Sequence, residues 1–254
     1  MSNTNAKYRV MTHMIAFYPD KEKSFQVAKA LIDGGASCIE LQFPFSDPTA
    51  DGPVIQAACG RALDSGFSLK EGFELAEKIV SYGRVPLFIM TYANPVITMR
   101  IDRFIARALE AGVAGLIVPD LVPGADEGLY AAGKAAGMPI VPVVVPTVSG
   151  ERLGEIAALG EDYLYVALRS GITGKETEIS REIISFLDSC SRTGMLSFGG
   201  FGIRSAEQIS ALQPHVHAPV VGSALVEVIT QHNGENADSI YTAVCDFTRR
   251  LCGE

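Results

Sequence analysis

Eight short apolar segments recur along the chain, and their regular spacing limits the possible folds more than any other feature. They are MTHMIAF (11–17), CIELQF (38–43), LFIMTY (87–92), GLIVPD (115–120), IVPVVV (140–145), YLYVAL (163–168), MLSFGG (195–200) and APVVGS (218–223). Each segment is too short for a helix and too apolar for a half-exposed strand, so each is expected to form a parallel strand buried on both faces. The amphipathic segments between them, several of which end in glycine, predict helices.

The spacing of the segments indicates eight strand–helix units. Strand starts lie roughly 23 to 32 residues apart, except for roughly 49 residues between the second and third, which places a surplus in the loop after the second strand. Eight such units predict a single (β/α)8 barrel domain over residues 1–254. A doubly wound open sheet is the alternative, although its glycine-rich turn is expected after the first strand, where IAFYPD contains no glycine.

The composition excludes some classes of partner. The net charge is -8, from 29 acidic and 21 basic residues, and the longest basic cluster is a pair of arginines near the C-terminus. Nucleic acids and anionic membrane surfaces are therefore not expected partners.

The five cysteines are irregularly spaced and form no CxxC pair, which favours a reducing compartment. The first residues have no signal-peptide core and no apolar run approaches a membrane span, so a cytoplasmic location is expected.

Glycine-rich segments after the last two strands predict a phosphate site. GGFGIRSAEQ (199–208) follows the seventh strand, and Gly222 and Ser223 open a helix after the eighth. Glycine lets the backbone approach a phosphate, and a helix N-terminus offers unpaired N–H groups. Loops 7 and 8 are also the common phosphate-binding loops of this barrel. The alternative is a tight turn followed by an ordinary helix cap.

Another glycine-bearing loop, LRSGITGKE (168–176), follows the sixth strand. Its residues Arg169, Thr173 and Lys175 could contact a ligand, and its two glycines would let it move as a lid. A solvent-exposed loop without a role is the alternative.

Three carboxylates lie close together in IELQFPFSDPTADGP (39–53). Glu40 falls inside an apolar strand, where an unpaired carboxylate is costly, and Asp47 and Asp51 follow in a proline-rich loop. A carboxylate that points into the barrel mouth is suited to taking and giving a proton. Alternatively, Glu40 is half of a buried ion pair and the aspartates form turns.

Several other chemistries lack the residues they need. No lysine falls at the end of an expected strand, which disfavours Schiff-base chemistry. The four histidines form no metal-binding pattern, with His13 alone in the first strand and His215 and His217 ahead of the last, so no metal site is expected. No GxSxG elbow supports a serine nucleophile.

The motifs together resemble the tryptophan synthase alpha subunit family. IELQFPFSDPTADGPVIQ resembles its signature, and MTYANPV (90–96), LIVPDLVP (116–123), YVALRSGITG (165–174), GGFGIRS (199–205) and VVGSALV (220–226) follow in order. The resemblance implies a barrel enzyme that cleaves indole-3-glycerol phosphate into indole and glyceraldehyde 3-phosphate without a cofactor. It also implies a partner beta subunit, which carries pyridoxal phosphate, receives indole and forms an alpha2-beta2 tetramer.

The resemblance assigns roles to individual residues. Glu40 matches the acid/base, Asp51 the aspartate that accepts the indole N–H, and Tyr165 a tyrosine beside the glutamate. The expected phosphate-binding residues are Gly174, Gly202, Gly222 and Ser223. The expected indole pocket contains Tyr92, Phe201 and His13, the lid contains Thr173 and Arg169, and the partner interface contains Asp47, Pro44 and Pro48.

The chain also departs from the family pattern near these residues. Phe17 and Tyr18 replace the glycine and aspartate of a TAGDP-like turn, His13 replaces an apolar pocket residue, and Gln42 replaces a glycine. Other hypotheses therefore stay open. The chain could be a non-catalytic relative that activates a beta subunit, a stand-alone lyase, or another phosphate-binding barrel such as a sugar-phosphate isomerase or a prenyl-glyceryl phosphate synthase.

Overall fold

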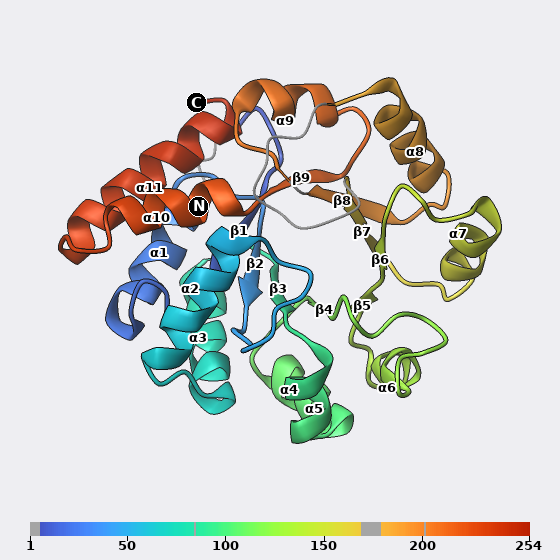
Figure 1. Ribbon diagram of the computed structural model, residues 1–254, viewed down its shortest axis with the longest axis horizontal. Helices are drawn as coiled ribbons and strands as arrows, with labels where there is room; N and C mark the ends of the chain where they lie inside the picture. Colours follow the sequence, from blue (N-terminus) through green and yellow to red (C-terminus); the bar gives the residue numbers. More distant parts are fainter. Residues whose placement is uncertain (1–5, 84, 169–178, 201) are drawn as a thin grey trace.

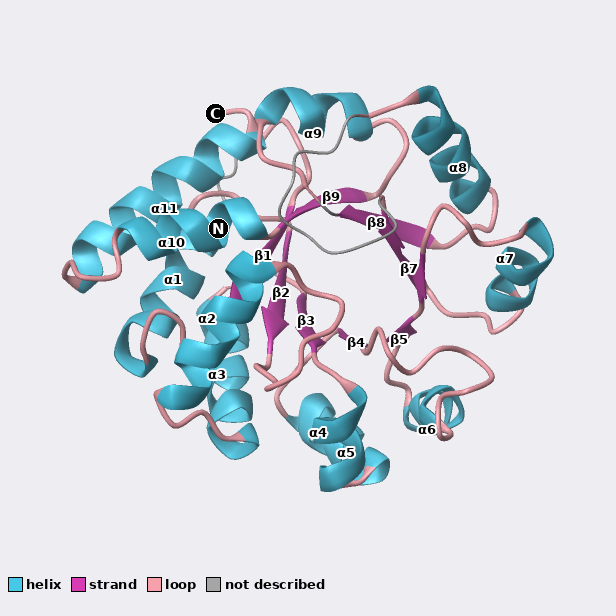
Figure 2. Cartoon of the chain, in the orientation of Figure 1, coloured by secondary structure: helices cyan, strands magenta, loops and turns pink. Residues whose placement is uncertain are grey.

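The computed structural model describes residues 6–83, 85–168, 179–200 and 202–254, and their strands form a parallel barrel surrounded by helices (Figures 1 and 2). The strands are β1 (Met11–Ile15), β2 (Cys38–Gln42), β3 (Leu87–Met90), β4 (Gly115–Ile117), β5 (Ile140–Val141), β6 (Val143–Val144), β7 (Tyr163–Ala167), β8 (Leu196–Gly200) and β9 (Ala218–Val221). The helices are α1 (Lys21–Asp33), α2 (Pro53–Asp64), α3 (Leu69–Tyr82), α4 (Ala93–Met99), α5 (Ile101–Glu110), α6 (Leu129–Ala136), α7 (Gly150–Ala157), α8 (Arg181–Ser191), α9 (Ala206–Leu212), α10 (Ser223–Gln231) and α11 (Ala237–Cys252).

The strand order confirms the barrel and corrects the strand count. The order is β5-β4-β3-β2-β1-β9-β8-β7-β6, so the first strand lies in the middle of the order and only Pro142 separates the two end strands in the sequence. The expected fifth strand, 140–145, is divided at Pro142, because proline has no N–H to donate to a neighbouring strand. Its carbonyl still accepts a hydrogen bond from the Tyr165 N–H at 2.9 Å. The chain itself therefore joins β5 to β6, and the open-sheet alternative is wrong.

The surplus residues after the second strand form a helix as well as a loop. Residues 43–52 make the loop, and α2 then precedes α3, the helix expected between two neighbouring strands. Pro53 occupies the first turn of α2, where its missing N–H has no intrahelical partner to lose. The loop above the barrel is therefore held between the end of β2 and the start of a helix.

Side chains of the strands alternate between two cores. In β2, Ile39 and Leu41 belong to the larger core between the strands and the helices, whereas Cys38 belongs to a smaller core inside the barrel. Phe88 and Phe198 also lie in the inner core, with ring centroids 5.1 Å apart. Because Glu40 is two residues from Cys38, the alternation places its side chain inside the barrel, as the sequence predicts.

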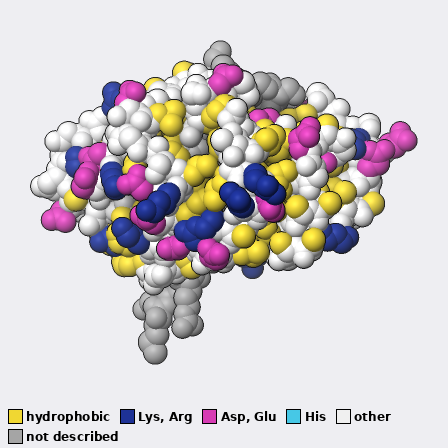
Figure 3. All heavy atoms as spheres, turned by 90° about the horizontal axis from the view of Figure 1, so that it is seen from below, with side chains coloured by type: hydrophobic (Ala, Val, Ile, Leu, Met, Phe, Trp, Pro, Cys, Tyr) yellow, Lys and Arg dark blue, Asp and Glu magenta, His cyan; other side chains and the backbone are white. Residues whose placement is uncertain are grey.

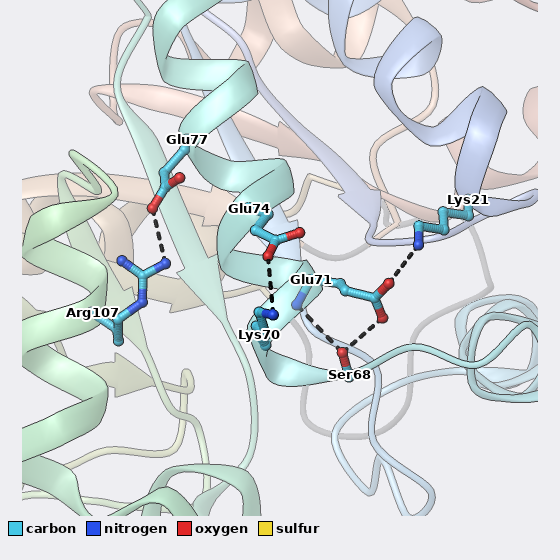
Figure 4. Close-up of polar contacts among 7 residues, drawn as sticks. All are labelled: Lys21, Ser68, Lys70, Glu71, Glu74, Glu77 and Arg107. Atoms are coloured by element: carbon cyan, nitrogen blue, oxygen red, sulfur yellow. Dashed lines mark hydrogen bonds and ion pairs between the residues drawn. The ribbon is translucent and has the colours of Figure 1, made fainter.

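Polar contacts fasten α3 to both of its neighbours on the outside of the barrel (Figure 4). Lys21 at the start of α1 bonds to Glu71, and Arg107 of α5 bonds to Glu77 at 2.9 Å. Ser68 caps α3 by accepting the backbone N–H of Glu71. These exposed contacts add little stability individually, but together they fix α3, the second helix after the loop that bears Asp51.

The surface carries mixed charge. Figure 3 shows the face at the lower edge of Figure 1, where basic side chains gather near the middle with acidic and hydrophobic side chains among them. Within the described residues, no helix is long and apolar enough to cross a membrane.

Candidate active site

A cavity of about 510 Å³ opens at the carboxyl ends of the barrel strands. Its walls come from nearly every strand end, and its polar members include His13, Glu40, Asp51, Tyr165 and Ser223. The sequence predicts all five of them as site residues. The loops of a barrel converge at this end, so residues far apart in the sequence share one cavity.

Glu40 lies in the cavity wall and is paired with a histidine. It is 4 % exposed, and its Oε2 lies 2.9 Å from Nδ1 of His13, which is also 4 % exposed. Residues His13 and Glu40 are opposite each other in the register of β1 and β2, so both side chains point into the barrel. The sequence analysis gives His13 no polar partner, whereas the structure pairs it with Glu40, so the alternative of a buried pair at Glu40 is the observed geometry.

The electrostatics of this pair favour a charged histidine. Burial by itself lowers the pKa of His13, but the Glu40 carboxylate, the hydrogen bond to it and the charge of Asp51 raise it, and the net shift is upward. A protonated His13 would give the pair no net charge while leaving a carboxylate in the cavity wall.

Asp51 is held by two donors on one oxygen. The amide Nε2 of Gln42 donates to Oδ2 of Asp51 at 2.7 Å, and the hydroxyl of Tyr92 donates to the same oxygen at 2.8 Å. Burial raises the pKa of Asp51, while His13, Tyr92 and Gln42 oppose the rise. Gln42, which departs from the family pattern, is therefore a hydrogen-bond donor to the carboxylate expected to face the indole nitrogen.

The loop that carries Asp51 is tightly folded. The N–H of Asp51 donates to the carbonyl of Pro48 at 3.0 Å, and the N–H of Thr49 donates to the carbonyl of Asp47 at 2.9 Å. The side chain of Gln56 donates to the backbone carbonyl of Asp51 at 2.8 Å. The backbone of Asp51 is therefore fixed from both sides of the turn.

Tyr165 lines the cavity opposite these carboxylates, on β7. A Cβ built on Gly200 would lie 2.7 Å from its hydroxyl oxygen, so a side chain at position 200 would force the Tyr165 ring to move. Burial, Glu40 and Asp51 all raise the pKa of Tyr165. Its hydroxyl is therefore protonated at neutral pH and can donate a hydrogen bond.

Three of the four expected phosphate-binding residues line the same cavity. They are Gly202, Gly222 and Ser223. Gly202 has a φ of 78°, which a residue with a side chain rarely adopts, and Gly222 is the N-cap of α10, with Ser223 as its first residue. Gly199 and Gly200 lie within β8, so they contribute to strand packing rather than to the loop.

The remaining expected pocket and lid residues divide into two groups. Tyr92 is 1 % exposed and lies behind Asp51, outside the set of described residues that line the cavity. Phe201, Thr173, Arg169 and Gly174 lie outside the residues that the structure describes. Their roles remain predictions.

The loop expected to meet a partner is only partly exposed. Asp47 is exposed, whereas Pro44 and Pro48 are buried against the barrel. Asp47 is therefore available to another protein, and the two prolines support the loop from below.

Phe17 and Tyr18 lie in the turn after β1, outside the described wall of the cavity. Phe17 has a φ of 67°, a left-handed conformation that glycine adopts without strain and a residue with a side chain rarely does, and its ring packs edge-on against Phe67 at 5.4 Å. Tyr18 hydrogen-bonds Thr230 of α10 at 2.7 Å. The two departures in this turn therefore pack against the helix layer, while those at His13 and Gln42 contact the carboxylates.

Two polar lining residues were missed by the sequence analysis, Thr147 and Arg152. Arg152 also donates hydrogen bonds to the carbonyl of Pro123 and to Glu155, which ties the start of α7 to the loop after β4. Both residues follow the divided strand at 140–145, so the rule that loops after barrel strands form the site would have found them.

Among the residues described, no group of three or more His, Cys, Asp or Glu side chains is arranged to hold a metal ion.

Comparisons with known proteins agree on one family. The family model for the tryptophan synthase alpha chain matches residues 1–250. The tryptophan synthase alpha chain of Helicobacter hepaticus is 38% identical over 235 residues, covering 89% of this chain and 87% of the relative. That of Methanosarcina acetivorans is 37% identical over 225 residues, covering 88% of this chain and 82% of the relative.

Solved structures are similar along almost the whole chain. Mycobacterium tuberculosis tryptophan synthase aligns with a TM-score of 0.86 at 26% identity, covering 99% of this chain and 93% of that one. A chain of the tryptophan synthase complex from Pyrococcus furiosus aligns with a TM-score of 0.86 at 30% identity, covering 97% and 98%.

Proposed function

The chain belongs to the tryptophan synthase alpha chain family, and we propose that it cleaves indole-3-glycerol phosphate into indole and glyceraldehyde 3-phosphate. The observation that carries this proposal is the convergence of Glu40 and Asp51 with Gly202, Gly222 and Ser223 on one cavity. Carboxylates at one side and a glycine-bordered helix N-terminus at the other suit a substrate with a reacting ring and a phosphate at opposite ends.

Glu40 is the proposed proton carrier. The reaction breaks the bond between indole C3 and the first glycerol carbon, so C3 gains a proton and the hydroxyl on that carbon loses one as the aldehyde forms. A carboxylate in the cavity wall can take the proton of the hydroxyl and deliver a proton to indole C3, which leaves the enzyme unchanged after one turnover. Tyr165, across the cavity, is the proposed hydrogen-bond donor to the reacting groups.

Asp51 is the proposed partner of the indole nitrogen. Protonation at C3 leaves positive charge on the ring, and a carboxylate that accepts the indole N–H hydrogen bond stabilises that charge. Gln42 and Tyr92 already occupy one oxygen of Asp51, which leaves the other for the ring. The phosphate is proposed to lie on the N–H groups at the start of α10 and at Gly202, with Gly174 and the lid residues Arg169 and Thr173 completing the site.

The structural neighbour from Pyrococcus furiosus is a tryptophan synthase complex, which supports the proposal that this chain also works with a beta subunit. The exposed Asp47 in the loop above Asp51 is a candidate contact. We propose that the whole chain acts as one cytoplasmic barrel domain that needs no cofactor of its own, with pyridoxal phosphate carried by the beta subunit.

One assay tests the function directly. The purified chain is incubated with indole-3-glycerol phosphate, with and without a beta subunit, and indole is measured. We expect slow cleavage by the chain alone and faster cleavage with the partner. The matched variants are Glu40→Gln, which should be inactive, and Glu74→Gln on the exposed face of α3, which should retain full activity (Figure 4).

The outcomes separate the remaining hypotheses. Absence of indole in both conditions, from a folded wild-type chain, would favour the non-catalytic relative. Cleavage that the beta subunit does not accelerate would favour the stand-alone lyase. Full activity of Glu40→Gln would overturn the proton carrier while leaving the reaction assigned.

A further inference from the structure

His13 and Gln42 replace residues of the family pattern, and each bonds to one of the two carboxylates proposed for chemistry. His13 Nδ1 lies 2.9 Å from Glu40 Oε2, and Gln42 Nε2 lies 2.7 Å from Asp51 Oδ2. His13 is 4 % exposed and Gln42 is fully buried. The four side chains form one cluster, because the charge of Asp51 also acts on His13.

The same two residues hold the buried polar atoms that lack a partner within the described chain. These atoms are Nε2 of His13 and Oε1 of Gln42. A buried polar atom without a hydrogen bond costs about 1–3 kcal/mol, and an apolar residue or glycine at these positions would avoid that cost. Proteins tolerate an unpaired buried polar atom most readily at functional sites, where another atom of the same side chain contributes to function.

The geometry of the cluster suits the task of holding the carboxylates still. A side-chain carboxylate rotates about two bonds unless other groups restrain it, and each restraint here is a short hydrogen bond from a residue packed within the barrel. The imidazole also lies against the N-cap of α10, since a Cβ on Gly222 would lie 3.6 Å from Cβ and 3.7 Å from Cγ of His13. The ring of His13 is therefore fixed between Glu40 and the proposed phosphate end of the cavity.

We propose that His13 and Gln42 are positioning residues, which hold Glu40 and Asp51 in their reactive orientations before substrate binds. This inference rests on the proposed cleavage reaction and deepens it by adding two residues to the same site. His13 acts through its Nδ1–H donor and through its charge, whereas Gln42 acts through its amide donor alone.

The charge of His13 gives the proposal a second consequence, which concerns pH. The titratable groups that face His13 are Glu40 of β2 and Asp51 of the following loop; Cys38 lies further down β2, and Tyr165 faces both carboxylates from β7. Positive charge on His13 opposes the rise in the pKa of Asp51 that burial causes. Removing that charge should raise the pKa of Asp51 further and move the acid limb of the kcat profile to higher pH.

The test compares matched variants at each position. His13→Phe keeps a ring but has no donor, and His13→Asn keeps a donor near the position of Nδ1 but cannot be charged. Gln42→Met keeps the length of the side chain and removes the amide. His215→Asn is the control. It removes another histidine–carboxylate pair, in which Nδ1 of His215 lies 2.7 Å from Oδ1 of Asp188, and this pair lies outside the described wall of the cavity.

Steady-state cleavage of indole-3-glycerol phosphate is measured with all variants across pH. We expect kcat to fall about 10- to 100-fold in His13→Phe and Gln42→Met with KM changed by less than about threefold. His13→Asn should recover most of kcat, since it restores the donor, but should keep the shifted acid limb. His215→Asn should match wild type in rate and in pH profile.

A measurement that does not depend on activity keeps the inference separate from the function. Proton–carbon NMR follows the four histidines during titration, and the His13→Asn spectrum assigns His13. Glu40→Gln should lower the pKa of His13, because it removes the carboxylate that raises it. If that pKa is unchanged, or if folded His13→Phe and Gln42→Met retain wild-type kcat and pH profile, the positioning roles are refuted. If wild type makes no indole but the titration shifts as expected, only the reaction is refuted.

Discussion

The two halves of the barrel interior differ sharply although the same strands build both. At the amino-terminal half, Met11 of β1 and Cys38 of β2 lie in an apolar core with Phe88 and Phe198. Two residues further along the same two strands, the inward side chains are His13 and Glu40, which form a buried pair. A step of about 7 Å along a strand thus separates close-packed rings from buried charge.

This difference teaches where stability and chemistry are placed. Aromatic packing stabilises the fold without unpaired polar atoms, whereas the cluster at the mouth contains two such atoms. Substitutions in the amino-terminal half of the barrel interior should therefore act mainly on the free energy of unfolding. Substitutions at the mouth should act mainly on the rate of cleavage.

The largest expected effect is at the mouth. Glu40→Gln should reduce kcat for cleavage of indole-3-glycerol phosphate about 10³- to 10⁴-fold, because the amide cannot carry the proton between the hydroxyl and indole C3. Its free energy of unfolding, measured with urea, should change by no more than about 2 kcal/mol. A variant that loses most of its stability as well as its activity would break the contrast between the two halves.

The next effect is at the packed end. Phe198→Ala should destabilise the chain by about 3–5 kcal/mol in urea unfolding, because it leaves a cavity beside Phe88 and the stacked ring of Tyr163. The fraction that remains folded should retain its kcat. Phe247→Ala, at a partly buried position on α11, is the control and should cost clearly less. If the two variants lose the same free energy of unfolding, the inner core does not contribute more to stability than the helix layer.

The sequence predicts much of this contrast. The apolar segments identify the strands, and the alternation in CIELQ places Glu40 inside the barrel. The segment IVPVVV already contains the proline that divides it, because a residue without an N–H interrupts a parallel ladder, and the prediction of one strand over 140–145 is wrong for that reason. The helix α2 was not predicted from the spacing between the second and third strands, because that spacing gives the length of the extra segment but not its secondary structure.

The polar cluster was not predicted, and the reason is the strand register. His13 and Glu40 are 27 residues apart, and a single sequence does not state which residues of two parallel strands are opposite each other. One signal was available, because His13 and Glu40 are both the third residue of their strands. The hydrogen bond from Gln42 to Asp51 could not be predicted either, because it depends on how the loop 43–52 folds back over the barrel.

A third prediction concerns the pH dependence of stability at the mouth. The pKa of His13 is raised above 6.5 in the folded chain, so its pair with Glu40 stabilises the fold fully below about pH 6.5. This contribution is lost as the pH rises through the raised pKa. The free energy of unfolding of wild type should therefore exceed that of His13→Asn by about 1–3 kcal/mol near pH 6, and the difference should shrink at higher pH. In a Glu40→Gln background the trend should reverse, because burial then lowers the pKa of His13. Persistence of the wild-type trend there would mean that another group is responsible.

The smallest effect is expected outside the barrel, and it sharpens the contrast by showing what an ordinary charged pair contributes. Glu74 of α3 lies 3.9 Å from Lys70, and both side chains are largely exposed to solvent (Figure 4). Glu74→Gln should change the free energy of unfolding by less than about 0.5 kcal/mol, with the effect fading in high salt. The pair of His13 and Glu40 is buried, so its contribution should respond much less to salt. If both pairs respond equally to salt, water reaches the mouth cluster in solution, and the electrostatic difference between the buried pair and the surface pair does not hold.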